Sequence, residues 1–238
     1  MKVIQKKDYE EISRTAAERI LAMVQEKPSC VLGLATGSTP IRTYEFLAMA
    51  CQQRRITFEK TRTINLDEYV GLGEADPQSY RFFMETHLFR HIDIKRENTH
   101  LPDGLAADLE AECMRYDALY AQLGGVDLQL LGIGQNGHIG FNEPGAVLDA
   151  NTHVALLSEN TRAANSRNFS SLSEVPHRAI TLGMGGILKA RHILLLASGE
   201  QKKEAVQKAL YGKVDPAVPA SFLQLHPDVT VLCDFALT

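Results

Sequence analysis

An α/β fold of three layers, with a mostly parallel central sheet flanked by helices, is predicted from two observations. Short runs of consecutive apolar residues, typical of strands buried on both faces, alternate along the chain with amphipathic stretches of helical period. Several of these runs lead directly into turns of small polar residues that precede a helix. In open α/β sheets such turns lie at the carboxyl ends of the strands, where ligands bind.

The composition favours a single domain over residues 1–238. The chain has 238 residues, 45% of them hydrophobic, and a net charge of −4. Lys and Arg are dispersed, which argues against nucleic-acid binding. The sequence has no apolar signal segment and no run of membrane-spanning length, so we expect a cytoplasmic protein without membrane contact. The cysteines lack metal-ligand spacing and fit a reducing compartment: Cys30, Cys51, Cys113 and Cys233.

A strand and a helix are predicted to open the chain. Val3 and Ile4 are typical of a short strand. Asp8 is expected to cap a helix over residues 9–25, with Glu11 completing a capping box, and Pro28 follows its end.

The next strand leads into a turn that suits phosphate. The buried run 30–34 is followed by the turn 35–40, whose side chains include Thr36, Ser38 and Thr39. Its last residue, a proline, is expected to start a helix over residues 41–52. Free N–H groups at a helix start, with nearby hydroxyls, bind phosphate well; an ordinary capped turn is the alternative.

Two acidic residues follow the next predicted strand, residues 61–66. Asp67 and Glu68 come directly after it, and neighbours in an extended chain point in opposite directions, so only one is expected to face the ligand. A partly desolvated carboxylate gains basicity and suits proton abstraction from carbon. Two solvated loop acids are the alternative.

The middle of the chain is predicted to contain two more helices and another strand. Periodic apolar residues indicate helices over 78–90 and 106–123, separated by a strand end and turn at 98–104. The run 126–131 is typical of a buried strand.

The glycine-rich loop that follows this strand, residues 132–144, contains a histidine and a carboxylate five residues apart, His138 and Glu143. Glycines such as Gly137 let the chain turn sharply and let its backbone approach a ligand. We therefore expect an acid–base pair at the carboxyl end of a strand, with a purely structural glycine turn as the alternative.

The same loop matches the dinucleotide-binding fingerprint through Gly132, Gly134 and Gly137, and Glu159 supplies an acid after the next apolar run. The fingerprint also requires a helix that begins at the third glycine. Residues 141–145 contain proline and glycine and oppose a helix, so nucleotide binding is disfavoured.

A polar segment, residues 145–175, is predicted to be a lid that closes over substrate. It contains a short helix over residues 160–169, on which Arg167 is suited to clamp an anion, with a solvated arginine as the alternative. Beyond it, strands are expected at 179–183, 193–197 and 229–233. Lys202 lies in a second strand–turn–helix unit and would be near a phosphate if this turn lies beside the turn of Thr36 to Thr39. The helix of that unit is expected over residues 203–210.

Taken together, these residues resemble the glucosamine-6-phosphate isomerase/deaminase family, which also includes 6-phosphogluconolactonases. The resemblance covers nearly the whole chain. Its Phe-Asn-Glu-Pro ending separates deaminases from lactonases. The motifs are Ala35-Thr36-Gly37-Ser38-Thr39-Pro40, Leu66-Asp67-Glu68-Tyr69-Val70-Gly71-Leu72, Asn136-Gly137-His138-Ile139-Gly140-Phe141-Asn142-Glu143-Pro144, Thr161-Arg162-x-x-Asn165-Ser166-Arg167 and Gly199-x-x-Lys202.

The resemblance implies a Rossmann-like fold of the deaminase/ribose-phosphate-isomerase type and a reaction that needs neither metal nor cofactor. D-glucosamine 6-phosphate and water would give D-fructose 6-phosphate and ammonia. His138, oriented by Glu143, would open the sugar ring, and Asp67 would move the proton from C2 to C1. The phosphate would be held by Arg167, Lys202 and the turn Thr36, Gly37, Ser38 and Thr39.

One position departs from some family members, which have aspartate where this chain has Asn136. Asparagine can hydrogen-bond His138 but cannot stabilise an imidazolium by charge, so we expect lower activity on the acid side. The chain also lacks the basic residues and the C-terminal extension of hexameric, allosterically activated members, so a monomer is expected.

Two alternative functions share this pattern. A lactonase acting on a phosphorylated sugar lactone needs the histidine and the phosphate site, but no base at C2. A sugar-phosphate sensor domain of a transcription regulator is the second alternative, although such proteins carry a helix-turn-helix ahead of the fold.

Overall fold

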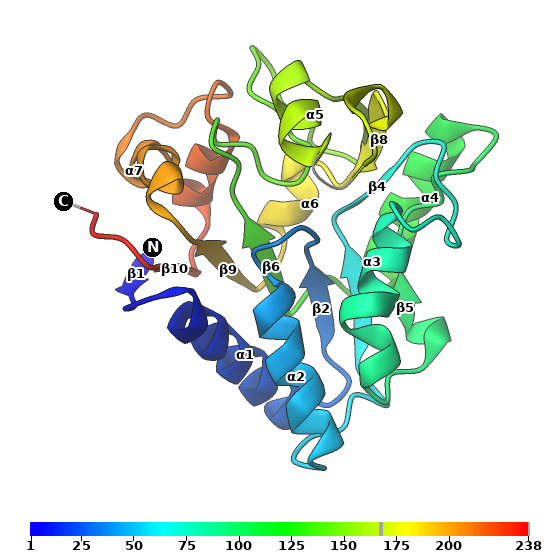
Figure 1. The fold of residues 1–238 in the computed structure, drawn as a ribbon, viewed down its shortest axis with the longest axis vertical. Helices are drawn as coiled ribbons and strands as arrows, with labels where there is room; N and C mark the ends of the chain where they lie inside the picture. The colour runs from blue at the N-terminus through cyan, green and yellow to red at the C-terminus, as the bar shows by residue number, and fades with distance from the viewer. Residues whose placement is uncertain (167–168, 238) are drawn as a thin grey trace.

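A seven-stranded parallel sheet forms the centre of the computed structural model, which describes residues 1–166 and 169–237 (Figure 1). All of its neighbouring strands are parallel, which confirms the predicted α/β fold. In spatial order the strands are β1 (Lys2–Gln5), β10 (Val229–Cys233), β9 (His192–Ala197), β6 (Leu128–Gly132), β2 (Val31–Leu34), β3 (Arg62–Asn65) and β5 (Thr99–His100).

The strand order places the ligand-binding end of the sheet between β2 and β6. From β2 the chain moves outward to β3 and β5, and then returns to β6 on the other side of β2. At such a reversal the loops that follow the two central strands diverge and leave a crevice. The loops after β2 and β6 are the two glycine-containing segments that the sequence singled out.

Helices cover both faces of this sheet. On one face, side chains of three helices form a core with Leu32 and Leu34: α1 (Tyr9–Glu26), α2 (Ile41–Gln52) and α3 (Tyr80–His87). On the other face the core includes Leu131 and Leu195 and residues of α4 (Leu109–Gln122), α6 (Met184–Leu188) and α7 (Lys203–Tyr211). Short 3-10 segments complete the chain: η1 (Phe89–His91), η2 (Arg96–Asn98), η4 (Leu172–Glu174), η5 (Glu200–Lys202) and η6 (Pro219–Leu225).

A second, antiparallel sheet lies beyond the carboxyl ends of β2 and β6 (Figure 1). It contains β4 (Asp67–Tyr69), β8 (Arg178–Thr181) and β7 (His153–Leu156), and α5 (Glu159–Asn165) follows β7. The chain passes from β3 into β4 at Leu66, so Asp67 and Glu68 lie in a strand, and the alternative of two solvated loop acids is wrong. Most of the segment predicted as a lid, β7 and α5 included, belongs to this upper layer.

The first residue of α1, α3, α4 and α5 is set by a capping hydrogen bond rather than by the first apolar residue of the helical pattern. The Asp8 side chain accepts from the Glu11 N–H at 2.9 Å, as predicted. Glu11 accepts from the N–H of Lys7 rather than from that of Asp8, so the capping box is incomplete. The helices α3 and α4 begin later than predicted, because Ser79 and Asp108 cap them. The helix α5 begins one residue earlier than predicted, because Ser158 caps it.

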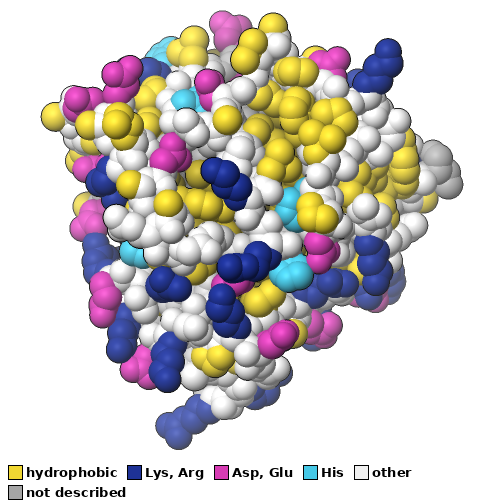
Figure 2. All heavy atoms as spheres, turned by 180° about the vertical axis from the view of Figure 1, so that it is seen from behind, with side chains coloured by type: hydrophobic (Ala, Val, Ile, Leu, Met, Phe, Trp, Pro, Cys, Tyr) yellow, Lys and Arg dark blue, Asp and Glu magenta, His cyan; other side chains and the backbone are white. Residues whose placement is uncertain are grey.

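The surface carries mixed charges. Lys and Arg side chains are interspersed with Asp and Glu on the face shown in Figure 2, in keeping with the net charge of −4. Within residues 1–166 and 169–237, no helix combines the length and the apolar character that a membrane span needs.

One buried hydroxyl in β3 offers a direct test of this packing. The Oγ1 atom of Thr63 is buried and has no hydrogen-bond partner among the described residues. Thr63→Val keeps the shape and removes an unpaired polar group, so we expect the free energy of unfolding to rise by about 1 kcal/mol in urea titrations. Thr61→Val is the matched control, because Thr61 Oγ1 donates to the Pro28 carbonyl at 3.1 Å, and it should destabilise the fold. A loss of stability in Thr63→Val would contradict the expectation.

Candidate active site

Four loops meet at the carboxyl ends of β2, β3, β6 and β9. They bring together the residues that the sequence analysis selected, apart from Arg167, which lies outside the described residues. No group of three His, Cys, Asp or Glu side chains in the described part of the chain is arranged to hold a metal ion.

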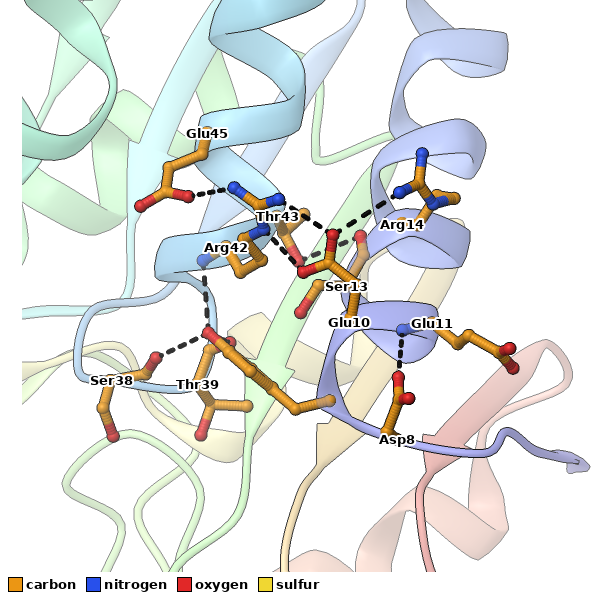
Figure 3. A network of polar contacts seen from close by, with 11 residues as sticks. Asp8, Glu10, Glu11, Ser13, Arg14, Ser38, Thr39, Arg42, Thr43 and Glu45 are labelled. Atoms are coloured by element: carbon orange, nitrogen blue, oxygen red, sulfur yellow. Dashed lines mark hydrogen bonds and ion pairs between the residues drawn. The ribbon is translucent and has the colours of Figure 1, made fainter.

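The turn after β2 is fixed from below by a tyrosine of α1. Tyr9 Oη donates to the carbonyl oxygens of Ser38 and Thr39, at 3.0 and 3.1 Å, and accepts from the Arg42 N–H at 3.2 Å (Figure 3). Gly37 adopts φ +91°, which favours glycine, and a Cβ there would meet no atom within 4 Å. Hydrogen bonds to its backbone thus hold the turn in place, and the space next to Gly37 contains no other atom of the described residues.

The amino end of α2 lies next to this turn. The residue before α2, Pro40, makes no side-chain cap hydrogen bond. The Arg42 guanidinium points away from the turn and binds Glu10 at 2.7 Å and Glu45 at 2.6 Å (Figure 3). The Arg42 N–H is taken by Tyr9 Oη, and the other N–H groups of the first turn of the helix are suited to an anion at the turn.

Asp67 is a buried carboxylate without a protein donor. Only 5% of the residue is exposed, and no hydrogen bond to its side chain is formed within the described residues. A Cβ on Gly140 would lie 3.3 Å from Asp67 Oδ2, so the glycine lets the loop after β6 approach this carboxylate closely. Burial, helped by the charge of Glu68, raises the pKa of Asp67 to about 8. The group is suited to act as a base.

Glu68 points the other way and holds the amino end of α3. It is 2% exposed, and its carboxylate accepts from the N–H groups of Tyr69, Tyr80 and Arg81 at 2.8, 2.8 and 2.9 Å. Burial raises the pKa of Glu68 to about 7, and these N–H donors act in the opposite direction. Its contacts are those of a structural cap, and its influence on the site is exerted through its charge next to Asp67.

The loop after β6 contains no helix at its third glycine, which removes the dinucleotide-binding geometry. His138 lies against Gly134, where a Cβ would be only 2.2 Å from the imidazole Cε1. The Nδ1 atom of His138 is buried without a hydrogen-bond partner and lies 3.9 Å from Glu143 Oε2. Burial lowers the pKa of His138, Glu143 opposes this effect, and the nearby charge of Lys202 adds to it.

Asn136 bridges the backbone of His138 and the Glu143 carboxylate. Its Oδ1 accepts from the His138 N–H at 3.2 Å, and its Nδ2 donates to Glu143 Oε2 at 3.0 Å. Asn136 was expected to hydrogen-bond His138; the contact is made to the backbone N–H and not to the ring. The asparagine therefore shapes the loop and stabilises the charged Glu143 carboxylate with one neutral donor.

The turn after β9 brings in Lys202, the last residue of η5. Gly199, with φ +89°, donates its N–H to Asp234 Oδ1 at 2.8 Å, and Ser198 Oγ donates to Asp234 Oδ2 at 2.5 Å. Because Lys202 affects the pKa of His138, its ammonium lies on the side of the site where the histidine is.

Some of these contacts were not foreseen from the sequence. Tyr9 and Asp234 support the two turns, and Asn142 Nδ2 donates to the Ile139 and Leu182 carbonyls at 2.9 and 3.0 Å. Glu143 also receives a hydrogen bond from Thr161 of α5, and the hydroxyl oxygen of Ser158 lies 3.3 Å from it. Of these residues, Asn142 and Thr161 belong to the motifs quoted above, whereas Tyr9 and Asp234 have no sequence signal.

Comparison with known proteins gives a consistent family match. Residues 6–232 match the model of glucosamine-6-phosphate isomerases/6-phosphogluconolactonase. A glucosamine-6-phosphate deaminase of Lachnoclostridium phytofermentans is 57% identical over 235 residues, covering 99% of this chain and 100% of its own.

Solved structures agree with this match. One described as a monomeric glucosamine-6-phosphate deaminase superposes with a TM-score of 0.96 at 51% identity, covering 98% of this chain and 97% of its own. A 6-phosphogluconolactonase of Leishmania guyanensis is more distant, with a TM-score of 0.76 at 25% identity and coverage of 98% and 95%.

Proposed function

Because this chain belongs to the family of glucosamine-6-phosphate isomerases and 6-phosphogluconolactonases, we propose that it converts D-glucosamine 6-phosphate and water to D-fructose 6-phosphate and ammonia. The 57% identity to a deaminase over nearly the full chain favours the deaminase reaction over the lactonase reaction of the same family. The buried carboxylate of Asp67 supports it, because deamination needs a base at C2 and lactone hydrolysis does not.

The phosphate group is bound by the turn after β2 and by Lys202. A phosphate monoester carries a charge of about −2 near neutral pH. The N–H groups at the start of α2 and the hydroxyls of Thr36, Ser38 and Thr39 offer donors, Gly37 leaves room above the turn, and the Lys202 ammonium supplies positive charge. Arg167 is assigned the same task from its motif alone.

Tyr9→Phe tests the support of this turn. Removal of the hydroxyl deletes its hydrogen bonds to the Ser38 and Thr39 carbonyls but leaves the ring in place. We expect KM for the sugar phosphate to rise about fivefold with kcat nearly unchanged, which corresponds to the loss of about one net hydrogen bond. Steady-state kinetics measure both constants. Tyr211→Phe, an exposed tyrosine at the end of α7, is the control, and a Tyr9→Phe enzyme with unchanged KM would contradict the assignment.

Ring opening is assigned to His138. Burial lowers the pKa of His138, so the ring is neutral near pH 7 and can take the proton of the anomeric hydroxyl and return one to the ring oxygen. Glu143 stabilises the positive charge that the imidazole carries between these two transfers. Asn136 holds both the loop and the carboxylate.

Isomerisation is assigned to Asp67. Its carboxylate removes the proton from C2 of the open-chain aminoaldehyde, and the electron pair of the C–H bond forms the C1–C2 double bond of an enolamine. The π pair of the C1 carbonyl moves to its oxygen, which takes a proton from water, and the nitrogen returns a proton to water when the imine forms. The same group returns the proton to C1, which leaves an imine at C2. Water adds to this imine and ammonia departs, so the atoms balance.

Three further properties belong to this proposal. The likeness to a structure described as a monomeric deaminase supports a monomer. The four cysteines are free thiols, which supports the cytoplasm. Residues 145–175 act as a lid, since they supply α5 above the carboxyl ends of the strands.

The decisive test is turnover. Purified protein should release ammonia and form fructose 6-phosphate from glucosamine 6-phosphate in equal amounts without added metal. Hydrolysis of 6-phosphogluconolactone, with no ammonia from the amino sugar, would replace the proposal with a lactonase. Binding of either compound without turnover would favour a sugar-phosphate sensor.

A further inference from the structure

The Glu143 carboxylate is held from opposite sides by two different segments. On the Oε2 side lie Asn136 Nδ2, at 3.0 Å, and the His138 ring, at 3.9 Å. On the Oε1 side, the Thr161 hydroxyl donates a hydrogen bond and the Ser158 hydroxyl lies at 3.3 Å. A carboxylate that is fixed at one oxygen presents the other in a defined direction, here toward the histidine.

The Thr161 hydroxyl is not needed to cap its own helix. The cap is made by the Ser158 side chain, which accepts from the backbone N–H of Thr161 at 3.2 Å. Ser158 Oγ also donates toward Thr161 Oγ1 at 3.1 Å, so the Thr161 proton is directed to Glu143. Thr161 is 4% exposed, so water does not compete for this contact.

We propose that Thr161 is a positioning residue for the ring-opening step, which orients Glu143 toward His138 through its hydroxyl. The assignment rests on the proposed function and extends it to α5. Since α5 lies in the segment above the strand ends, the geometry of the histidine–glutamate pair depends on where this helix sits. The orientation of the Glu143 carboxylate thus depends on a hydroxyl of residues 145–175, and not only on residues of the loop after β6.

Among the described residues, two charged groups act on the His138 ring, Glu143 and Lys202. His138 is in the same loop as Glu143, and the charge of Lys202 reaches the histidine from η5. On α5, the Arg162 guanidinium is turned away and donates to the carbonyls of Leu172 and Val175, at 2.9 and 3.1 Å. The contribution of α5 to Glu143 is therefore made by a neutral hydroxyl donor, that of Thr161, which stabilises the charged form of the carboxylate.

The test compares two variants. Thr161→Val keeps the shape of the side chain but removes the hydroxyl, and Thr161→Ser keeps the hydroxyl. For Thr161→Val we expect kcat to fall about tenfold with KM changed less than about twofold. The loss should be absent on a 4,5-dideoxy form of glucosamine 6-phosphate, which cannot close into a ring and therefore needs no ring opening. Thr161→Ser should stay within about twofold of wild type in kcat on the natural sugar.

Controls separate this assignment from folding and from the proposed function. Thr63→Val is a buried threonine substitution in β3 without an acidic partner and should leave kinetics unchanged. If Thr161→Val does not fold, Thr161→Ala takes its place. If wild type is active and kcat is unchanged in the valine variant, the assignment is overturned, and so it is by equal losses in the valine and serine variants or by an equal loss on the analogue that cannot form a ring. A wild type that releases no ammonia overturns the proposed function and this assignment with it.

Discussion

Asp67→Asn is expected to lower kcat by about a thousandfold or more, with the affinity for a sugar phosphate held within about threefold. Asparagine fills the same space but cannot take a proton from carbon. The contacts assigned to the phosphate come from the loops after β2 and β9, so binding should survive. Ammonia release measures the loss, and the dissociation constant of fructose 6-phosphate measures binding.

The pH dependence of the wild-type enzyme follows from the same carboxylate. Burial and the charge of Glu68 raise the pKa of Asp67 to about 8, and only the deprotonated form can act as a base. The kcat/KM value should therefore rise with pH up to about 8. Glu68→Gln removes the neighbouring charge, so this limb should move to lower pH, whereas the fold should weaken because a carboxylate at the start of α3 is lost.

Stability should change in the opposite sense to activity in Asp67→Asn. The folded protein holds the Asp67 proton more tightly than the unfolded chain, since its pKa is raised from 3.8 to about 8. Wild-type stability is therefore lost as pH rises between these values. The asparagine variant avoids this loss, so its melting temperature should exceed that of wild type near pH 8 and approach it near pH 4. A variant that is less stable than wild type near pH 8, or that keeps its turnover, would contradict the role given to Asp67.

The turns at the carboxyl ends of the strands were predicted better than the short elements β4 and α6. The turn at Gly37 and the loop at His138 were located correctly because glycine after a buried apolar run has few other uses. The short strand β4 was missed, since Asp67-Glu68-Tyr69 has no strand period and is extended only because β8 pairs with it. The helix α6 was missed because Met184–Leu188 is short and contains two glycines.

The side-chain network of the site depends on contacts far apart in the chain. Thr161 reaches Glu143 across 18 positions, and Tyr9 reaches Thr39 across 30. No local pattern encodes such pairs, because each partner only meets the other once the sheet and the upper layer have assembled. The acid–base residues could therefore be predicted from the sequence, but the side chains that hydrogen-bond them and fix their orientation could not.

The second large effect is expected for His138→Gln, which should lower kcat/KM about a hundredfold for the natural substrate. The imidazole is neutral near pH 7 because burial lowers its pKa, and it is assigned the proton transfer that opens the ring. Glutamine can hydrogen-bond the same atoms but cannot carry a proton between them. The residual rate should reflect the small fraction of substrate that opens in solution.

An analogue that cannot form a ring separates the two roles. A 4,5-dideoxy form of glucosamine 6-phosphate lacks the hydroxyls that close the sugar, so it needs a base at C2 but no ring opening. His138→Gln should deaminate it within about threefold of the wild-type rate, whereas Asp67→Asn should remain inactive. If both variants lose turnover of this analogue to the same extent, His138 takes part in the step at C2, and the division of labour between the loops after β3 and β6 must be redrawn. If His138→Gln instead keeps the wild-type rate on the natural sugar, the ring opens without the histidine, and the buried Nδ1 at 3.9 Å from Glu143 has another purpose.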